Sequence, residues 1–216
     1  MPSKTANSNQ ICIDSIPAET IIVPIIGTSP LIVHNWSVKA KRMMLEREQG
    51  RKQVKENRDP RAEYEAAFYR IDKGDGKDHY GFPVTAFKAA TIGAARLYGK
   101  DVTMTQLRQC LFFHGIMTPA DKQQLVEIVG EPQMREDMVR MGGMGHNADL
   151  RYRPEFVEWS AELKVTYVKT AIQRGSVLSL IDAGGFGVGV GEWRPEKSGE
   201  FGTYRVDTDR EVRVIG

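Results

Sequence analysis

The sequence predicts an α+β fold whose elements follow the order strand, helix, strand, strand, helix, strand, with a charged helical insertion near the start. Three observations predict it: residues 157 to 167 alternate apolar and polar side chains, residues 84 to 98 form a helical pattern rich in small residues, and residues 176 to 182 form a second helical pattern. With 216 residues, 41% of them hydrophobic, a single core can hold the chain together. We therefore expect one domain over residues 11 to 216.

The first ten residues, 1 to 10, are polar and lack periodicity, which predicts a flexible tail. A β-branched run at residues 19 to 26 then predicts a buried strand. Pro24 removes one ladder hydrogen bond from this strand and indicates a bend or an edge position. After a turn, residues 31 to 33 form a second apolar piece.

Residues 37 to 79 form the charged insertion. A helix is predicted over residues 37 to 58, followed by a short amphipathic piece and a glycine turn at residues 73 to 78. From residue 39 to residue 70, ten basic residues oppose six acidic ones, which gives a local charge of +4. Two interpretations stay open, because the glutamates of this helix could neutralise its cations. If they do not, the candidates for contact with a polyanion are Lys39, Lys41 and Arg42.

The helix predicted over residues 84 to 98 ends at Gly99. Its small residues allow close approach to a sheet, while Lys88 and Arg96 point away from that contact. A second helix is predicted over residues 105 to 113, and a strand over residues 125 to 129.

Residues 131 to 154 are predicted to form a loop that contains three glycines. Its four arginines could wrap a nucleic-acid backbone, because guanidinium groups bind phosphate well; they are Arg135, Arg140, Arg151 and Arg153. Five acidic residues in this stretch or directly after it oppose this interpretation, namely Glu131, Glu136, Asp137, Asp149 and Glu155.

The clearest strand pattern runs from Val157 to Tyr167, with one face towards the core and the other towards solvent. After it we expect the helix over residues 176 to 182, a glycine-rich loop, and a final β pattern at residues 203 to 206 and 212 to 215.

Composition excludes several classes of protein. Thirty basic and 28 acidic residues give a formal net charge of +2, so any site for a polyanion must be local. Cys12 and Cys110 are far apart and form no CxxC pair, which argues for a reducing compartment and against structural zinc. No uncharged run reaches the ~20 residues that span a bilayer. We expect a cytoplasmic protein without a membrane partner.

Catalytic and metal-binding motifs are not evident. The four histidines are scattered without HExxH or HxE spacing, and no serine lies in a GxSxG motif. We therefore expect no cofactor, no metal and no enzymatic activity.

The run from Gly185 to Gly191 follows a helix and leads to a strand, whereas a Rossmann fingerprint follows a strand and opens a helix. Walker A fails as well, because Glu196 stands where a glycine is required. A flexible turn is one interpretation. The other is nucleic-acid binding, because the following residues interleave aromatic rings with cations: Trp193, Arg194, Lys197, Tyr204 and Arg205.

Three motifs, in this order, resemble the repeat-associated mysterious protein (RAMP) superfamily, which includes the subunits that coat the guide RNA of CRISPR effectors. They are Thr28-Ser29-Pro30-Leu31 after the first strand, Phe82-Pro83-Val84-Thr85-Ala86-Phe87-Lys88 leading to Arg96, and the late glycine-rich loop. The resemblance covers residues 20 to 207 and implies a ferredoxin-like, RNA-recognition-motif-like β-α-β-β-α-β core. The chain departs from it at Glu192 and Glu196, which place acid in a loop expected to meet phosphate.

A second resemblance concerns residues 151 to 156 and 191 to 197, which are similar to uncharacterised proteins of tailed phages. It implies that the chain belongs to a mobile element and works in the host cytoplasm.

The RAMP resemblance implies a non-catalytic protein that coats single-stranded DNA or RNA as adjacent copies, with Lys88, Arg96 and the late loop at the backbone. Other subunits of a nucleoprotein complex are further expected partners. Because the exposed face of the Val157 to Tyr167 strand offers Glu158 and Glu162 and no aromatic ring, bases are not expected to stack there. Two rivals are a metal-independent endoribonuclease of the same superfamily, with His34 as base, and a phage structural or inhibitory protein that binds only protein.

Overall fold

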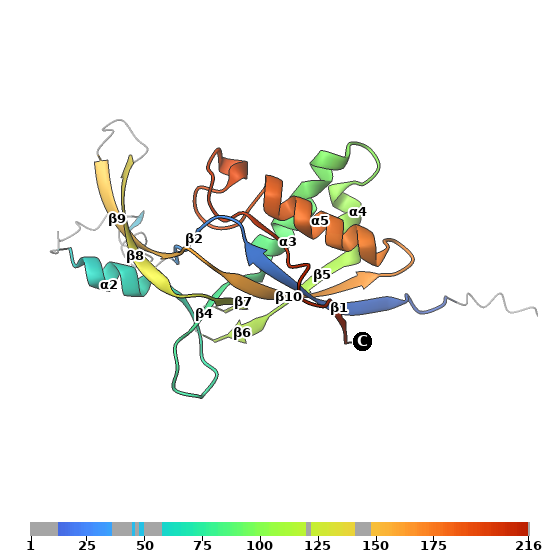
Figure 1. Ribbon diagram of the computed structural model, residues 1–216, viewed down its shortest axis with the longest axis horizontal. Coiled ribbons are helices and arrows are strands. Elements are labelled where there is room, and N and C mark those ends of the chain that lie inside the picture. The colour runs from blue at the N-terminus through green and yellow to red at the C-terminus, as the bar shows by residue number, and fades with distance from the viewer. Residues whose placement is uncertain are drawn as a thin grey trace, which may run out of the picture.

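The computed structural model describes residues 13–35, 45, 48–49, 58–119, 122–140 and 148–215 (Figure 1). Within them the chain forms two antiparallel sheets, and its longer helices gather on one side of the larger sheet. The α+β class predicted from the sequence is confirmed. No helix in these ranges combines the length and the apolar character that a membrane crossing needs.

The larger sheet contains nine strands of the described chain. They are β1 (Ala18–Gly27), β3 (Tyr69–Ile71), β4 (His79–Pro83), β5 (Leu111–His114), β6 (Ile116–Thr118), β7 (Gln123–Val129), β10 (Ser160–Val168), β11 (Tyr204–Val206) and β12 (Arg213–Val214). Six of them lie in the order β11-β1-β10-β7-β4-β3, while β12 pairs with β1, β5 with β10 and β6 with β7.

The centre of this sheet is the long pair β1 and β10, whose register runs from Ala18 opposite Val168 to Ile26 opposite Ser160. Alternate residues of both strands are buried in one core with side chains of α3 (Val84–Gly93) and α5 (Arg174–Gly187). Burial of each aliphatic side chain of this kind stabilises the fold by about 1.5 to 3 kcal/mol. The strand predicted from its alternation of apolar and polar residues, β10, therefore lies at the centre of the sheet.

Along the chain, β1, α3, β7, β10, α5 and β11 follow the predicted order strand, helix, strand, strand, helix, strand. In space, β11 lies beside β1 and β10 lies between β1 and β7. This arrangement is compatible with the predicted ferredoxin-like unit.

The two core helices pack closely against each other at Gly184 of α5. A Cβ atom at this position would lie 2.8 Å from backbone atoms of Ala90 in α3. The small residues of α3 thus allow both α5 and the sheet to pack closely against this helix. α3 continues into the 3-10 helix η1 (Ala94–Tyr98), and Gly99 follows with a φ of 67°.

A second sheet has the order β2-β9-β8 and corrects the loop predicted over residues 131 to 154. Its strands are β2 (Leu31–Ile32), β8 (Pro132–Arg140) and β9 (Ala148–Phe156). β8 and β9 pair over nine positions and extend away from the body beside α2 (Pro60–Ala66) (Figure 1). The pattern was missed because charged residues such as Arg135, Asp137 and Arg153 occupy alternate positions on one face, where a strand usually places apolar side chains.

Three predicted element boundaries also change. The helix predicted over residues 105 to 113 is α4 (Met104–Cys110), and its last part is strand β5, because Leu111 and Phe113 pair with β10 and enter the core. The strand predicted from Val157 begins at Ser160. The helix predicted over residues 176 to 182 extends through Gly187, so that part of the supposed glycine-rich loop is helical.

Several predicted features lie outside the described residues. They are the tail at residues 1 to 10, most of the helix at residues 37 to 58, and the candidates Lys39, Lys41 and Arg42. The described part of the predicted insertion contains α2, with Asp59 as its N-cap, and β3, which pairs with β4 in the larger sheet.

Candidate nucleic-acid interface

The segment from Val188 to Thr203, which we call the anchored loop, connects α5 to β11. Its backbone is fixed at several points: Val190 N donates to Gly202 O at 2.9 Å, Glu192 N donates to Ile32 O at 3.1 Å, and Gly202 N donates to Pro30 O at 2.8 Å. Gly202 has a φ of 66°, and a Cβ atom there would lie 1.7 Å from Val190 O. The flexible turn, one of the two interpretations of the glycine run, does not describe this ordered loop.

A pocket of about 220 Å³ lies between α3 and the anchored loop. One wall consists of small residues of α3, namely Ala86, Ala89 and Ala90, and another consists of loop residues from Val188 to Glu192. Aromatic side chains Tyr69 and Phe82 also contact it, and Arg194 and Glu196 lie at its polar side. Small walls of this kind leave space for a ligand group close to the protein backbone.

Cations from two distant segments meet at Glu196, next to this pocket. Arg194 Nη2 lies 2.9 Å from Glu196 Oε2, and Arg96 Nη1, from η1, lies 3.7 Å from Glu196 Oε1. The hydrogen bond from Arg194 and the charges of Arg194, Lys197 and Arg96 hold the pKa of Glu196 below its ordinary value. Three positive charges therefore surround one negative charge. We call Arg96, Arg194, Lys197 and Glu196 the cation cluster.

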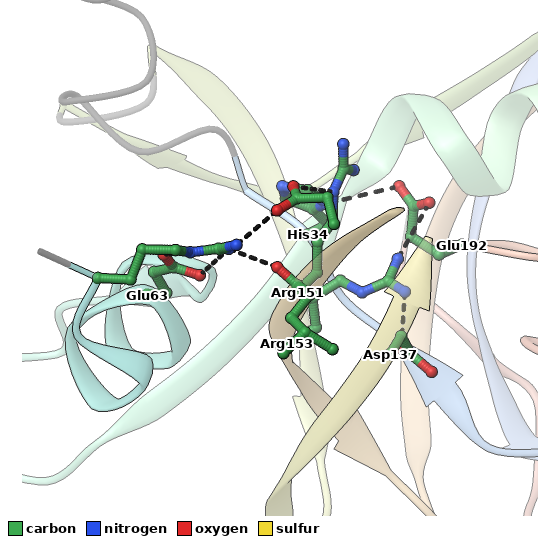
Figure 2. A network of polar contacts seen from close by, with 9 residues as sticks. His34, Glu63, Asp137, Arg151, Arg153 and Glu192 are labelled. Atoms are coloured by element: carbon green, nitrogen blue, oxygen red, sulfur yellow. Dashed lines mark hydrogen bonds and ion pairs between the residues drawn. The ribbon is translucent and has the colours of Figure 1, made fainter. Parts of the chain in front are cut away.

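The other end of the pocket contains His34. Its Nδ1 lies 4.0 Å from Glu192 Oε1, and burial lowers the pKa of this histidine, although the charge of Glu192 acts in the opposite direction. His34 is therefore neutral near pH 7. In Figure 2, dashed lines join Glu192 to both His34 and Arg153.

Two of the four arginines predicted at a nucleic-acid backbone, Arg135 and Arg153, form ion pairs within the protein. Arg153 is only 1% exposed and contacts Asp137 at 2.6 Å and Glu192 at 3.3 Å (Figure 2). Arg135 pairs with Asp137 at 2.8 Å and Glu155 at 2.6 Å. Arg151 is the more accessible member, 4.0 Å from Asp149. For Arg140 the structure describes only the backbone, in β8.

Two aromatic candidates are covered in part or in full by other side chains. Trp193 is half-buried, with the guanidinium carbons of Arg153 and Arg135 at 4.9 and 5.4 Å from its ring centre. Tyr204 is 1% exposed and packs against Phe87 and Trp159, and burial raises the pKa of its hydroxyl. Trp193 thus joins the anchored loop to the hairpin, and Tyr204 joins β11 to the core.

The remaining candidates do not join the cation cluster. Lys88 lies with its ammonium 5.5 Å from the ring centre of Phe112 in β5. Arg205 is exposed in β11, opposite Ile26. On the solvent face of β10, Glu162 pairs with Arg210 and, at 2.7 Å, with Arg213.

Sequence reasoning overlooked Phe186, which is 79% exposed near the end of α5. A signal was available: Val177, Leu180, Ile181 and Gly184 follow the helical period and are buried, and Phe186 does not fall on that stripe. In the described ranges, no group of three or more His, Cys, Asp and Glu side chains is arranged to hold a metal ion.

No protein-family model matches the chain, and no curated protein matches it. Among solved structures, the crystal structure of Cmr6 from Pyrococcus furiosus is similar, with 12% identity, a TM-score of 0.41, and coverage of 89% of this chain and 100% of that chain. A chain of a CRISPR RNA-guided surveillance complex is similar with 12% identity, a TM-score of 0.32, and coverage of 76% and 59%, respectively.

The names of both structures agree with the RAMP and CRISPR resemblance stated from the sequence, which stays a resemblance at this level of identity. Because both TM-scores are below 0.5, these similarities carry no argument about function. The function has to be inferred from the residues of this chain.

Proposed function

We propose that the chain binds single-stranded nucleic acid without cutting it, and that the backbone of the strand lies over the cation cluster. The observation that carries this proposal is the meeting of Arg96 with Arg194 and Lys197 around a single carboxylate, beside a pocket with small walls. Half to two-thirds of protein contacts to nucleic acid go to phosphate and sugar, and arginine and lysine supply many of them.

The pairing within the cluster leaves Arg96 and Lys197 exposed, whereas Arg194 is hydrogen-bonded to Glu196 and Gly191 O. Arg96 has a side chain that is 62% exposed, and its 3.7 Å contact with Glu196 is a long one. Exposed pairs of this kind contribute only about 0 to 1 kcal/mol, so a phosphate can replace Glu196 as the partner of Arg96 at little cost. Since the pocket is far smaller than a duplex, it suits groups of an unpaired strand.

Adjacent binding of several copies is part of the proposal. The hairpin extends from the body, and Met138 and Leu150 face each other in its register and are exposed, with Met134 exposed on the same face. These side chains offer a contact to a neighbouring copy on the same strand. Effective concentration between adjacent copies raises avidity by roughly 10² to 10⁴. Large particles on long oligonucleotides, and weak binding to very short ones, are expected by mass photometry.

The test compares binding of fluorescent single-stranded RNA, single-stranded DNA and duplexes at several salt concentrations. Replacing Arg96 and Lys197 by alanine is expected to weaken single-strand binding and to lower the salt slope by up to about 1.4, because each phosphate contact contributes about 0.7. The matched control replaces Arg61 and Lys77, two exposed cations outside the cluster. Equal effects of the two double variants, or no binding of any strand by the wild type, would contradict the proposal.

A second candidate function is cleavage of RNA without a metal, with His34 as the base. It is favoured by one observation, since His34 lines the pocket and burial lowers its pKa, so that it can accept a proton near pH 7. Cleavage of the RNA by the wild type in the presence of a chelator, abolished by His34→Ala, would establish this function in place of the first.

A further inference from the structure

Phe186 is held outward by the packing on both sides of α5. A Cβ atom at Gly184 would meet the backbone of Ala90 in α3, and one at Gly185 would lie 2.1 Å from Tyr204 O in β11. These two contacts leave the next position, Phe186, on the solvent side of the helix. Its 79% exposure is the largest of any phenylalanine among the described residues, so its ring is open to contact with a ligand.

The surroundings of Phe186 connect it to the cation cluster. A Cβ atom at Gly187 would lie 3.0 Å from Cδ1 of Leu97, the residue after Arg96 in η1. Two residues after Phe186, Val188 O accepts a hydrogen bond from Glu196 N at 3.2 Å. Leu97 and Tyr98 are themselves exposed and extend the apolar surface. Phe186 is therefore within two residues of contacts to both segments that supply the cations.

We propose that Phe186 is a platform on which one unpaired base stacks while the neighbouring phosphates contact Arg96 and Lys197. This inference rests on the proposed function and adds to it the residue that contacts a base. Proteins that bind single strands combine a positive surface for the backbone with aromatic rings for the bases, and every base offers a face for stacking.

A protein partner is less well matched to this surface. A stable interface buries about 800 Å² on each side, whereas the exposed apolar side chains here are Leu97, Tyr98 and Phe186. The adjacent charged groups of the cluster are mostly cations, and interface cores are depleted of charge. Unpaired bases linked by phosphates fit both the ring and the cations.

The experiment measures the affinity of Phe186→Ala and Phe186→Trp for a single-stranded RNA and for the same RNA with one abasic site placed at successive positions. Phe186→Ala is expected to weaken binding of the intact strand by roughly 5- to 150-fold with an unchanged salt slope, because one stacked base is lost and no phosphate contact. Phe186→Trp is expected to retain affinity. The matched control, Phe112→Ala, removes another exposed phenylalanine, on β5.

An abasic site at the stacked position is expected to weaken wild-type binding and to have no further effect on Phe186→Ala. If the wild type binds and Phe186→Ala, folded by circular dichroism, binds equally well, the stacking proposal is wrong and the surface is one for protein contacts. If the wild type binds no single strand, the proposed function fails together with it. The two failures are distinguished by the wild-type measurement alone.

Discussion

The anchored loop and the β8–β9 hairpin both bring arginines to the same side of the molecule, but they use them differently. In the hairpin, Arg135 and Arg153 share Asp137, and each has a second carboxylate, Glu155 for Arg135 and Glu192 for Arg153. In the loop, Arg194 shares one carboxylate, Glu196, with Arg96. In the hairpin, Arg135 and Arg153 thus each have two carboxylates within reach, whereas Arg194 and Arg96 share one.

We infer from this difference that the number of carboxylates within reach, and not the number of cations in a segment, determines whether the segment can bind phosphate. Guanidinium groups that are buried with two carboxylates have lost their water and gained partners, so exchange for a phosphate would leave a carboxylate unpaired. An exposed guanidinium with one distant carboxylate can exchange partners at little cost. Three predictions test this contrast, in order of decreasing effect.

The largest effect is expected from Asp137→Ala. Asp137 and Arg153 are both buried, and removal of the carboxylate would leave the guanidinium with Glu192 as its remaining ion-pair partner. We expect a loss of about 3 to 5 kcal/mol in the free energy of unfolding, measured by urea denaturation.

The control for that measurement is Asp149→Ala, which removes a carboxylate of the same hairpin whose partner, Arg58, is largely exposed. A loss of about 1 kcal/mol or less is expected there. If both variants lose the same small amount, the buried network does not hold the hairpin, and the contrast with the loop disappears.

A smaller effect is expected from Gly202→Ala in the anchored loop. The new Cβ atom would overlap Val190 O, at 1.7 Å, and the φ of 66° adds backbone strain. We expect a cost of about 3 kcal/mol together with loss of strand binding, because the loop that positions Arg194 and Lys197 must shift. Thermal unfolding and the binding assay measure the two effects.

Gly74→Ala is the matched control, since Gly74 has a φ of 73° and no atom within 4 Å of the added Cβ. At Gly74 the substitution is expected to cause backbone strain alone. It should lower the free energy of unfolding by about 1 to 2 kcal/mol and leave strand binding unchanged. Equal costs at the two glycines would mean that the loop adapts, and that its ordered backbone does not position the cations.

The sequence predicted the centre of the fold better than its periphery, for a physical reason. Alternation over residues 160 to 167 is visible because one face of β10 meets the apolar core and the other meets solvent. β8 and β9 instead bury networks of charged side chains. Because the residues of an ion pair are polar, their burial produces no alternation of apolar and polar residues in the sequence. The division between α4 and β5 at Leu111 depends on pairing with β10, which local propensity does not contain.

For the candidate site, sequence spacing identified Arg194 and Lys197 in one loop and Arg96 in one helix, but only the fold brings Arg96 to Glu196. Trp193 and Tyr204 were proposed for stacking because aromatic rings near cations fit that role. The same composition also fits rings that pack within the protein, and the structure shows this case: Trp193 packs on Arg153 and Arg135, and Tyr204 packs in the core. Phe186 was overlooked because the helix was predicted to end before it.

The smallest expected effect concerns His34, at the junction of the loop and the hairpin. Burial lowers the pKa of His34 in the folded protein below the ordinary value of 6.5, and the charges of Arg151 and Arg153 act in the same direction against that of Glu192. The unfolded chain therefore binds a proton at His34 more readily than the folded protein does. The stabilising contribution is complete above about pH 6.5 and is lost as the pH falls through the lowered pKa.

We expect the free energy of unfolding of the wild type to fall more steeply between about pH 7 and about pH 5 than that of His34→Gln, whose side chain does not titrate. His79 titrates with the opposite sign, because its hydrogen bonds to Asp75 and Glu127 raise its pKa, but it is present in both proteins and cancels in the difference. Urea denaturation across this pH range measures that difference. Identical pH profiles would mean that His34 titrates as in the unfolded chain, and that the junction between loop and hairpin is open to water.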